Sequence, residues 1–351
     1  MTHGSSVGAQ VPGTIVAGLH RAARVEDAVY AFIEPRLRQR GWRDTIIPYT
    51  GYGTQSWVRV MARLLLRRPQ QRPDHVPKVG GWRSFATLPV TAEVVTIDVG
   101  DRQHEVRTDR GGNIDVVVEA GLEPGWRTVR LHRAGAESVE APVRILAPDV
   151  RLAVVSDIDD TIMVTALPRP LLAAWNTFVL DEYARSPVPG MSVLYERLVT
   201  AHPEAPVFYL STGAWNAAPA LTRFLSRNLY PAGPLLLTDW GPTNDRLFRS
   251  GRAHKRATLE RLAREFPDVR WLLIGDDGQH DQEIYGNFVA SHPDNVAAVA
   301  IRQLSPTQSV LAGSLPVPTD EPASPDRHDR PWMSAPDGAG LARQLSETGL
   351  L

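Results

Sequence analysis

The chain of 351 residues is long enough for two domains, and its 43% hydrophobic and 22% charged residues are ordinary globular usage. Its 38 basic and 39 acidic residues give a formal net charge of −1, so no basic domain marks a nucleic-acid partner, and none is expected. The absence of cysteine excludes disulfides, zinc–thiolate sites and a thiol nucleophile.

The sequence contains neither a membrane-spanning pattern nor a secretory signal. No run of about 18 apolar residues occurs anywhere in the chain. Residues 1–18 lack a basic segment followed by an apolar one. We therefore expect a cytoplasmic protein.

The sequence predicts a tail and a helix over residues 1–45, followed by a β-rich domain over residues 46–148. Apolar residues recur at helical spacing from Ile15 to Ile33, and Pro35 is expected to interrupt or end that helix. Strand-like runs separated by Gly, Pro and Asp turns follow, among them 57–66, 93–99, 114–118, 128–132 and 139–145. Short strands at this spacing are typical of a small antiparallel β-sandwich.

From residue 149 to residue 305, apolar strands alternate with helices. The expected strands are 151–156, 207–210, 234–237, 271–274 and 296–301. The expected helices are 193–201, 218–229, 254–266 and 281–292. This alternation indicates an α/β domain with a parallel sheet sandwiched by helices. Residues 306–351 are expected to be a Pro-rich, solvated tail that ends in a short helix at 340–347.

Three carboxylates follow the first of these strands, at Asp157, Asp159 and Asp160. Their mutual repulsion calls for a cation or for shared protons. A calcium loop of the EF-hand type is excluded, because its sixth position would be Ile162 and its twelfth Pro168. Taken alone, the segment has a solvated acidic turn as its alternative interpretation.

Further polar residues stand at strand ends or near the start of a helix in the same region. Ser211 follows the second strand, where a helix N-cap or a turn is the ordinary role. Lys255 is one of two lysines among 38 basic residues, which favours a need for a compact ammonium group. Asp276, Asp277 and Asp281 follow the fourth strand, and alone they would indicate an everyday turn.

Together these side chains describe a site for a cation and a phosphoryl group. Open α/β sheets bind their ligands at the carboxyl ends of the strands, where these residues lie. Magnesium prefers hard oxygen ligands, and a phosphoryl group is bound by magnesium, lysine and a hydroxyl group. One carboxylate in such a site can act as the nucleophile, and a second one, two residues on, can carry the proton.

The order of these motifs resembles that of the haloacid-dehalogenase superfamily of phosphotransferases. The matching residues are the D-x-D-x-T segment at 157–161, Ser211, Lys255 and the G-D-D-x-x-x-D segment at 275–281. Within the superfamily, the chain is most similar to the lipin-like and fungal actin-patch phosphatidate phosphatases, above all to the bacterial relatives of the latter. The resemblance covers about residues 150–303, and it departs from the lipins at Asp160, where they carry glycine.

The resemblance implies a role for each of these residues. Asp157 would be the nucleophile, and Asp159 would be the general acid and base. Ser211 and Lys255 would bind the phosphoryl group. Mg²⁺ would be bound by the Asp157 carboxylate, the Asp159 carbonyl and Asp276, with Asp281 or Asp277 supporting it.

A short stretch lies between Thr161 and the expected helix at 193–201, and another lies between Ser211 and Lys255. Neither stretch can form a large lid over the site. An open site suits a bulky substrate, and we expect Mg²⁺-dependent hydrolysis of phosphatidate, a membrane phospholipid. Peripheral membrane contact is expected through the apolar segment 167–179 and Arg63, Arg67, Arg68 and Arg72, for which packing and a solvated face are the alternatives. A phosphoprotein or soluble phosphomonoester as substrate, and a non-catalytic binding module, stay open.

Overall fold

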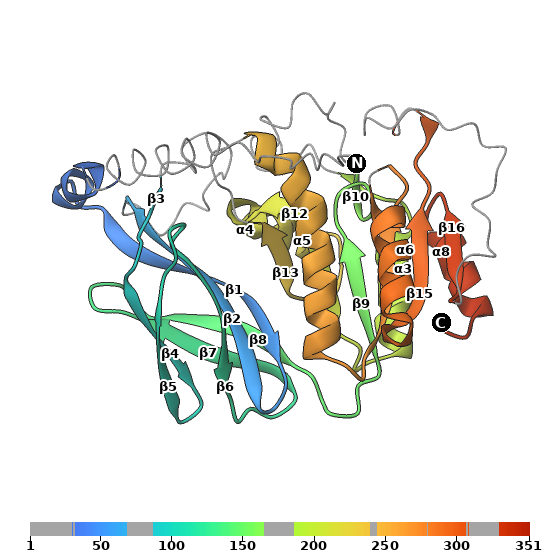
Figure 1. The fold of residues 1–351 in the computed structure, drawn as a ribbon, viewed down its shortest axis with the longest axis horizontal. Coiled ribbons are helices and arrows are strands. Elements are labelled where there is room, and N and C mark those ends of the chain that lie inside the picture. The colour runs from blue at the N-terminus through green and yellow to red at the C-terminus, as the bar shows by residue number, and fades with distance from the viewer. Residues whose placement is uncertain are drawn as a thin grey trace, which may run out of the picture.

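The computed structural model describes residues 30, 32–68, 87–164, 186–238, 244–278, 280–306, 308 and 330–351. These residues form two large sheets, each lined by a buried apolar core (Figure 1). We call residues 43–145 the β domain and residues 152–347 the α/β domain. None of the helices among the described residues is long and apolar enough to cross a membrane.

The β domain is a single hydrogen-bonded sheet of eight strands in the order β3-β2-β1-β8-β7-β4-β5, with β6 paired to β2. The strands are β1 (Arg43–Gly53), β2 (Trp57–Arg67), β3 (Leu88–Pro89), β4 (Val94–Val99), β5 (Arg102–Arg107), β6 (Asn113–Glu119), β7 (Gly125–His132) and β8 (Val139–Ile145). All pairs are antiparallel except β1 with β8. The expected strands are therefore present, but a sandwich of two separate sheets is not confirmed.

The side chains of these strands explain why they form a sheet. In β4, Val95, Ile97 and Val99 are buried while the residues between them are half-buried. This period of two matches the alternation of side chains across a strand. Each strand therefore contributes one apolar face to the core of the β domain.

The helix before β1 differs from the expectation at Pro35. Residues 32–39 are helical, so the helix continues through Pro35 instead of ending there. Proline removes one backbone hydrogen bond, and side-chain contacts one turn apart support the segment around it. Arg36 Nη1 donates to the Phe32 carbonyl at 2.5 Å, and Arg38 pairs with Glu34 at 2.8 Å. The part of the expected helix before residue 30 lies outside the described residues.

The α/β domain has a six-stranded parallel sheet in the order β13-β12-β9-β14-β15-β16, as the alternating pattern predicts. Its strands are β9 (Leu152–Asp157), β12 (Val207–Ala214), β13 (Leu235–Thr238), β14 (Arg270–Asp276), β15 (Val296–Arg302) and β16 (Trp332–Ala335). In Figure 1, α5 (Asn244–Glu265) and α6 (Asp281–Ser291) cover one face, and α3 (Met191–Ala201), α4 (Ala218–Arg227) and α8 (Gly338–Glu347) cover the other. Right-handed crossovers require this division for α3 and α4 on one face and for α5 and α6 on the other.

Short elements complete the α/β domain. The pair β10 (Met163–Val164) and β11 (Ser186–Pro187) stands apart from the main sheet, and the turns η3 (Trp215–Ala217) and η4 (Pro293–Asn295) follow β12 and α6. β9 lies between β12 and β14, so its carboxyl end lies near the middle of the row formed by the carboxyl ends of the strands.

The C-terminal segment differs from the expected solvated tail. Trp332–Ala335 forms β16, which pairs in parallel with β15. The expected short helix is present as α8, which packs beside α3 (Figure 1). A strand of four residues, flanked by Pro331 and Pro336, is too short to give a periodicity signal.

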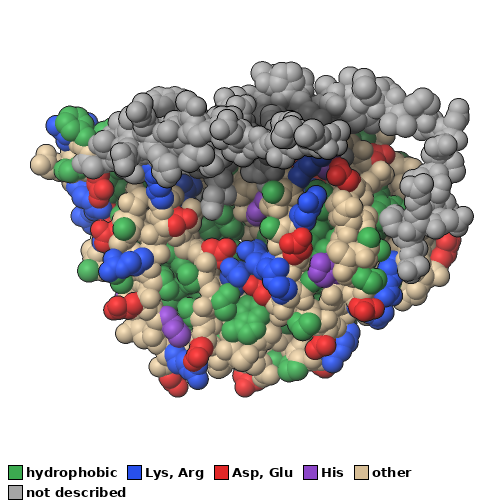
Figure 2. Space-filling model, in the orientation of Figure 1, with side chains coloured by type: hydrophobic (Ala, Val, Ile, Leu, Met, Phe, Trp, Pro, Cys, Tyr) green, Lys and Arg blue, Asp and Glu red, His purple; other side chains and the backbone are tan. Residues whose placement is uncertain are grey.

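Basic and acidic side chains are interspersed over the described part of the face that Figure 2 shows. This mixture agrees with the near-zero net charge of the chain. Of the residues expected to meet a membrane, segment 167–179 and Arg72 lie outside the described residues.

Candidate active site

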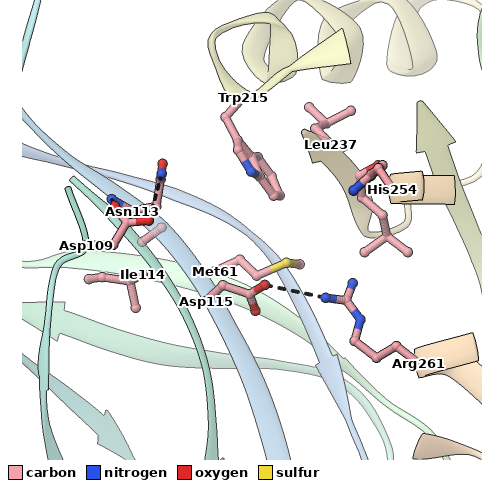
Figure 3. A pocket seen from close by; sticks show the side chains of 11 residues that line it. Met61, Asp109, Asn113, Ile114, Asp115, Trp215, Leu237, His254 and Arg261 are labelled. Carbon is pink, nitrogen blue, oxygen red and sulfur yellow. Dashed lines mark hydrogen bonds and ion pairs between the residues drawn. The ribbon is translucent and has the colours of Figure 1, made fainter. Parts of the chain in front are cut away.

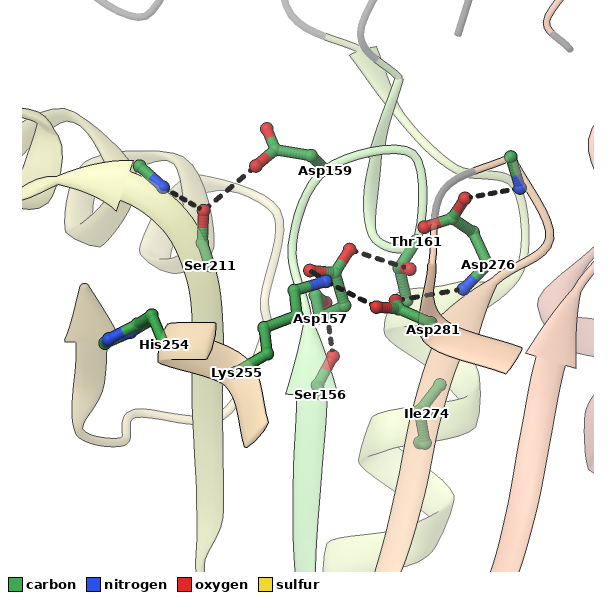
Figure 4. Close-up of polar contacts among 12 residues, drawn as sticks. Ser156, Asp157, Asp159, Thr161, Ser211, His254, Lys255, Ile274, Asp276 and Asp281 are labelled. Atoms are coloured by element: carbon green, nitrogen blue, oxygen red, sulfur yellow. Dashed lines mark hydrogen bonds and ion pairs between the residues drawn. The ribbon is translucent and has the colours of Figure 1, made fainter. Parts of the chain in front are cut away.

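Asp157 lies at the carboxyl end of β9 and is buried. The apolar run before it forms the central strand, and the chain turns back immediately after it, with the Ile162 and Met163 amides bonding the Ile158 carbonyl. Thr161 Oγ1 in this turn donates to Asp157 Oδ2 at 3.1 Å. The strand and the turn together fix the direction of the carboxylate (Figure 4).

Lys255 joins Asp157 to a second carboxylate. It lies on α5, and its buried Nζ donates to Asp157 Oδ1 and to Asp281 Oδ1, both at 2.6 Å. Burial lowers the pKa of Lys255, but the attraction of the surrounding carboxylates outweighs it, so the pKa is raised above its ordinary value. Lys255 is therefore a fixed positive charge at the carboxyl end of β9.

Asp276 and Asp281 bracket the loop between β14 and α6. Asp276 Oδ1 accepts from the Gly278 amide at 2.7 Å, and the Asp276 amide contacts Asp281 Oδ2 at 3.5 Å. Gly275 makes this approach possible, because a Cβ there would lie 2.6 Å from Asp281 Oδ2. Any side chain larger than hydrogen would push Asp281 away from β14.

Asp157, Asp276 and Asp281 form a donor set suited to a divalent cation. Each offers a carboxylate oxygen, and the three oxygens lie within 4.8 Å of one another. Burial raises the pKa of Asp157 and of Asp276 well above the ordinary value, and neighbouring carboxylates raise them further. Lys255 supplies only one positive charge among the three, so a hard cation such as Mg²⁺ fits this set.

Asp159 and Ser211 form a second polar pair at the same sheet edge. Ser211, in the second half of β12, donates from Oγ to Asp159 Oδ2 at 2.9 Å and accepts from the Gly213 amide at 2.9 Å. Both side chains are buried. Figure 4 shows this pair beside the cluster of Asp157 and Lys255, so all six predicted site residues meet at one end of the sheet.

The two candidates for the second acidic ligand lie in different places. Asp281 belongs to the carboxylate cluster. Asp277 Oδ1 instead accepts from the Leu304 amide at 2.8 Å, beyond the end of β15. The geometry thus groups Asp281, rather than Asp277, with Asp157.

One buried residue at this edge was missed in the sequence. Arg302, the last residue of β15, donates from Nη1 to the Asp160 carbonyl at 2.5 Å. Asp160 has a positive φ of 58°, so its turn is one that most side chains avoid. A charged residue that ends an apolar strand of a parallel sheet is the signal that could have revealed Arg302.

Residues 152–303 match the family model described as the catalytic domain of phosphatidate phosphatase APP1. The family resemblance expected from the sequence is confirmed over that segment. With it, the prediction of a phosphatase-like catalytic domain is confirmed. The matched segment runs from β9 to β15 and contains every residue of the site described above.

Two curated relatives are similar over part of the chain. Phosphatidate phosphatase APP1 of Saccharomyces cerevisiae is 25% identical over 210 residues, which are 58% of this chain and 35% of the yeast protein. An uncharacterised protein of Schizosaccharomyces pombe is 25% identical over 154 residues, 44% of this chain and 25% of its own length. The match to this chain thus spans about a third or less of each of these relatives.

Among solved structures, the HAD domain of the effector protein Lem4 from Legionella pneumophila is similar to this chain. It is 16% identical and covers 44% of this chain and 86% of its own, with a TM-score of 0.29. The structure called PhoD is 12% identical and covers 74% of this chain and 61% of its own, also with a TM-score of 0.29.

Proposed function

We propose that the chain is a Mg²⁺-dependent phosphomonoester hydrolase that acts through an aspartyl-phosphate and hydrolyses phosphatidate to diacylglycerol and phosphate. The observation that carries the proposal is the buried cluster of Asp157, Lys255, Asp276 and Asp281, at 2.6 Å from lysine to two of the carboxylates. This cluster lies within the segment that matches an APP1 catalytic domain.

Asp157 is the nucleophile in the first half of the reaction. Thr161 and Lys255 hold its two oxygens in place and favour its charged form. An Asp157 oxygen attacks phosphorus, the bond from phosphorus to the leaving oxygen breaks, and Asp159 gives that oxygen a proton. Mg²⁺, when bound by Asp157, Asp276 and Asp281, would offset the repulsion between anionic nucleophile and anionic substrate.

Asp159 and Ser211 complete the second half. Asp159, now charged, accepts a proton from water as the water oxygen attacks phosphorus, and the bond from phosphorus to Asp157 breaks to release phosphate. Ser211 donates to Asp159 at 2.9 Å, which fixes the direction of the carboxylate and stabilises its charged form. Lys255 binds the phosphoryl oxygens in both halves, and Ser211 binds them by turning its one hydroxyl proton from Asp159 to a phosphoryl oxygen.

The lipid substrate is supported by the similarity to a catalytic domain that is named for phosphatidate hydrolysis. A lipid headgroup at a bilayer requires a site that a large lid does not enclose, and we propose that the protein works in the cytoplasm at the membrane surface. The same chemistry on a phosphoprotein or on a soluble phosphomonoester is the second candidate.

The decisive experiment measures phosphate release from phosphatidate in mixed micelles, with and without Mg²⁺, beside a panel of soluble phosphomonoesters. Asp157→Asn serves as the test variant, because asparagine keeps the shape of aspartate and removes the nucleophilic charge. Asp98→Asn, on β4 of the β domain, serves as the matched control. We expect Mg²⁺-dependent release that is fastest with phosphatidate, is kept in Asp98→Asn and is lost in Asp157→Asn.

Other outcomes would change the proposal in defined ways. Activity confined to the soluble esters keeps the catalytic residues and removes the lipid. Substantial turnover by Asp157→Asn refutes the nucleophile. Inactivity of the unmodified chain on every substrate favours a non-catalytic binding module.

A further inference from the structure

The β domain stacks an aromatic ring on the chain just after Ser211. Tyr49 of β1 lies over Trp215, with ring centroids 4.4 Å apart and planes inclined by 26°. Tyr49 Oη also contacts the Trp215 carbonyl at 3.4 Å. Both residues are buried, and Trp215 begins the η3 turn directly after β12. The end of β12 that carries Ser211 is thus held from outside its own domain.

The β domain also forms hydrogen bonds and an ion pair with α5, the helix that carries Lys255. On α5, Glu265 accepts from Arg59 of β2 through Nε at 3.2 Å and Nη2 at 2.6 Å. The other Glu265 oxygen accepts from Tyr52 Oη at 2.8 Å. The carboxylate of Glu265 is therefore shared between two neighbouring strands of the β domain.

A second ion-pair contact joins α5 to β6. Asp115 of β6 pairs with Arg59 at 2.5 Å and with Arg261 of α5 at 3.5 Å. Figure 3 shows this pair of Asp115 and Arg261, and both residues line a cavity of about 150 Å³ between the domains. Trp215 and His254, the neighbour of Lys255, line the same cavity. The Tyr49–Trp215 stack on one element and the Arg59–Glu265 pair on another are two separate contacts between the domains.

We propose that the β domain positions the two elements that bind the phosphoryl group, through Tyr49 on the segment after Ser211 and Arg59 on α5. The proposal rests on the proposed function for the roles of Ser211 and Lys255. It assigns to Tyr49 and Arg59 a positioning role, because neither contacts the reacting groups.

Ser211 and Lys255 must keep a fixed position relative to each other to bind one phosphoryl group. Ser211 and Lys255 lie on different elements, and the phosphoryl oxygens must meet both at hydrogen-bond distance. Arg59 and Glu265 have exposed side-chain fractions of only 13% and 15%, so their pair is poorly screened by water. Loss of either contact allows β12 or α5 to shift by a fraction of an ångström, and such shifts reduce turnover more than substrate binding.

The chain offers a matched control for the Arg59 contact. Arg133 also has 13% of its side chain exposed and also pairs with two carboxylates, Asp44 at 2.7 Å and Glu93 at 3.1 Å. All three of these residues belong to the β domain. Arg59→Met and Arg133→Met therefore remove equivalent ion pairs, but only the first lies between the domains.

The first readout is turnover of p-nitrophenyl phosphate with Mg²⁺, below the melting temperature of every variant. We expect Arg59→Met and Tyr49→Ala each to lower kcat about 10-fold with less than a threefold change in KM. We expect Arg133→Met to keep the kcat of the unmodified chain. Tyr49→Phe, which keeps the ring on Trp215, should restore most of the kcat that Tyr49→Ala loses.

The second readout, backbone hydrogen exchange, does not depend on activity. We expect Arg59→Met and Tyr49→Ala to speed exchange at 211–217 or 251–265, with no change at 296–302 on β15. Arg133→Met should leave all three segments as they are.

Two results would overturn the proposal. One is an unchanged kcat and unchanged exchange in both Arg59→Met and Tyr49→Ala. The other is an equal loss of kcat in Arg59→Met and Arg133→Met, which would indicate a general loss of stability. If the unmodified chain has no activity, the proposed function fails, and the exchange data alone decide whether the β domain holds these segments.

Discussion

Lys255 is the residue whose chemistry the site constrains most tightly. Its Nζ has less room than a guanidinium group requires, since it lies 2.6 Å from two carboxylates and is buried. A compact ammonium can approach both oxygens, whereas the planar fork of arginine needs separate directions for its donors. This explains why a chain with so many arginines has lysine at this position.

Lys255→Arg should therefore fail although it keeps the charge. We expect kcat/KM for p-nitrophenyl phosphate to fall by about 100-fold or more, as in other sites that lose one electrostatic contact to the transition state. Circular dichroism and the melting temperature check that the variant is folded. Activity within threefold of the unmodified chain would contradict the role of Lys255.

The carboxylate cluster predicts a metal effect that can be measured without substrate. We expect Mg²⁺ to bind the folded site and not the unfolded chain, so at about 100 times Kd it should stabilise the fold by about 2.7 kcal/mol. Asp276→Asn should abolish the rise in melting temperature on Mg²⁺ addition and its reversal by EDTA. Asp277→Asn is the matched control, because asparagine can still accept from the Leu304 amide. Equal loss of the effect in both variants would contradict the geometry of the cluster.

Strands that are uninterrupted apolar runs could be predicted from the sequence, the four-residue β13 included, whereas β16 could not. β9 and β14 are continuous apolar runs, and both appear close to the expected bounds. β16 has only four residues, so its own sequence shows no period. It is a strand because it pairs with β15. Tertiary contact, rather than local pattern, makes it a strand.

The docking of α8 predicts a strong effect from one methyl group. Gly338 begins α8, and a Cβ there would lie 2.2 Å from the backbone of Gly190, just before α3. Gly338→Ala should destabilise the fold by about 1–3 kcal/mol through this overlap. Urea unfolding measures the loss, and Ala339→Gly, on the next residue of the helix, separates helix propensity from the overlap. No loss of stability in Gly338→Ala would show that α3 and α8 can separate freely.

The candidate site combines residues from well-separated segments that the chain brings to one sheet edge. Asp157, Ser211 and Asp276 could be found because each ends, or lies near the end of, an apolar strand of a parallel sheet. Lys255 was found as a rare lysine, but the expected helix start at residue 254 was wrong, because α5 begins at Asn244 and places Lys255 in its middle. The contacts of the β domain with the same elements could not be found. Tyr49 and Arg59 sit in an ordinary alternating strand pattern, and nothing in that pattern says which side meets another domain.

Stability of the whole molecule should depend on a half-buried histidine, His254, beside the interdomain cavity. Burial lowers the pKa of His254 to about 4, and Nε2 lies 3.3 Å from the Leu236 carbonyl. The charges near it are Arg261, Lys255 and Asp115. Between pH 4 and pH 6.5 the unfolded chain binds a proton at His254 that the folded chain does not, so this stabilisation is present above pH 6.5 and is lost as pH falls.

The titration of His254 alone should lower the free energy of unfolding by about 2 kcal/mol as the pH falls from 7 to 5. Asp157 and Asp276, whose pKa values are raised, contribute with the opposite sign, so only a comparison of variants isolates the histidine. His254→Gln keeps a donor for the Leu236 carbonyl and cannot titrate. Urea unfolding of both proteins at pH 7 and pH 5 should show a smaller acid loss, or a gain, in the variant. Parallel curves would mean that His254 takes up its proton in the folded state as readily as in the unfolded one, which its position on α5 against the Leu236 carbonyl of β13 opposes.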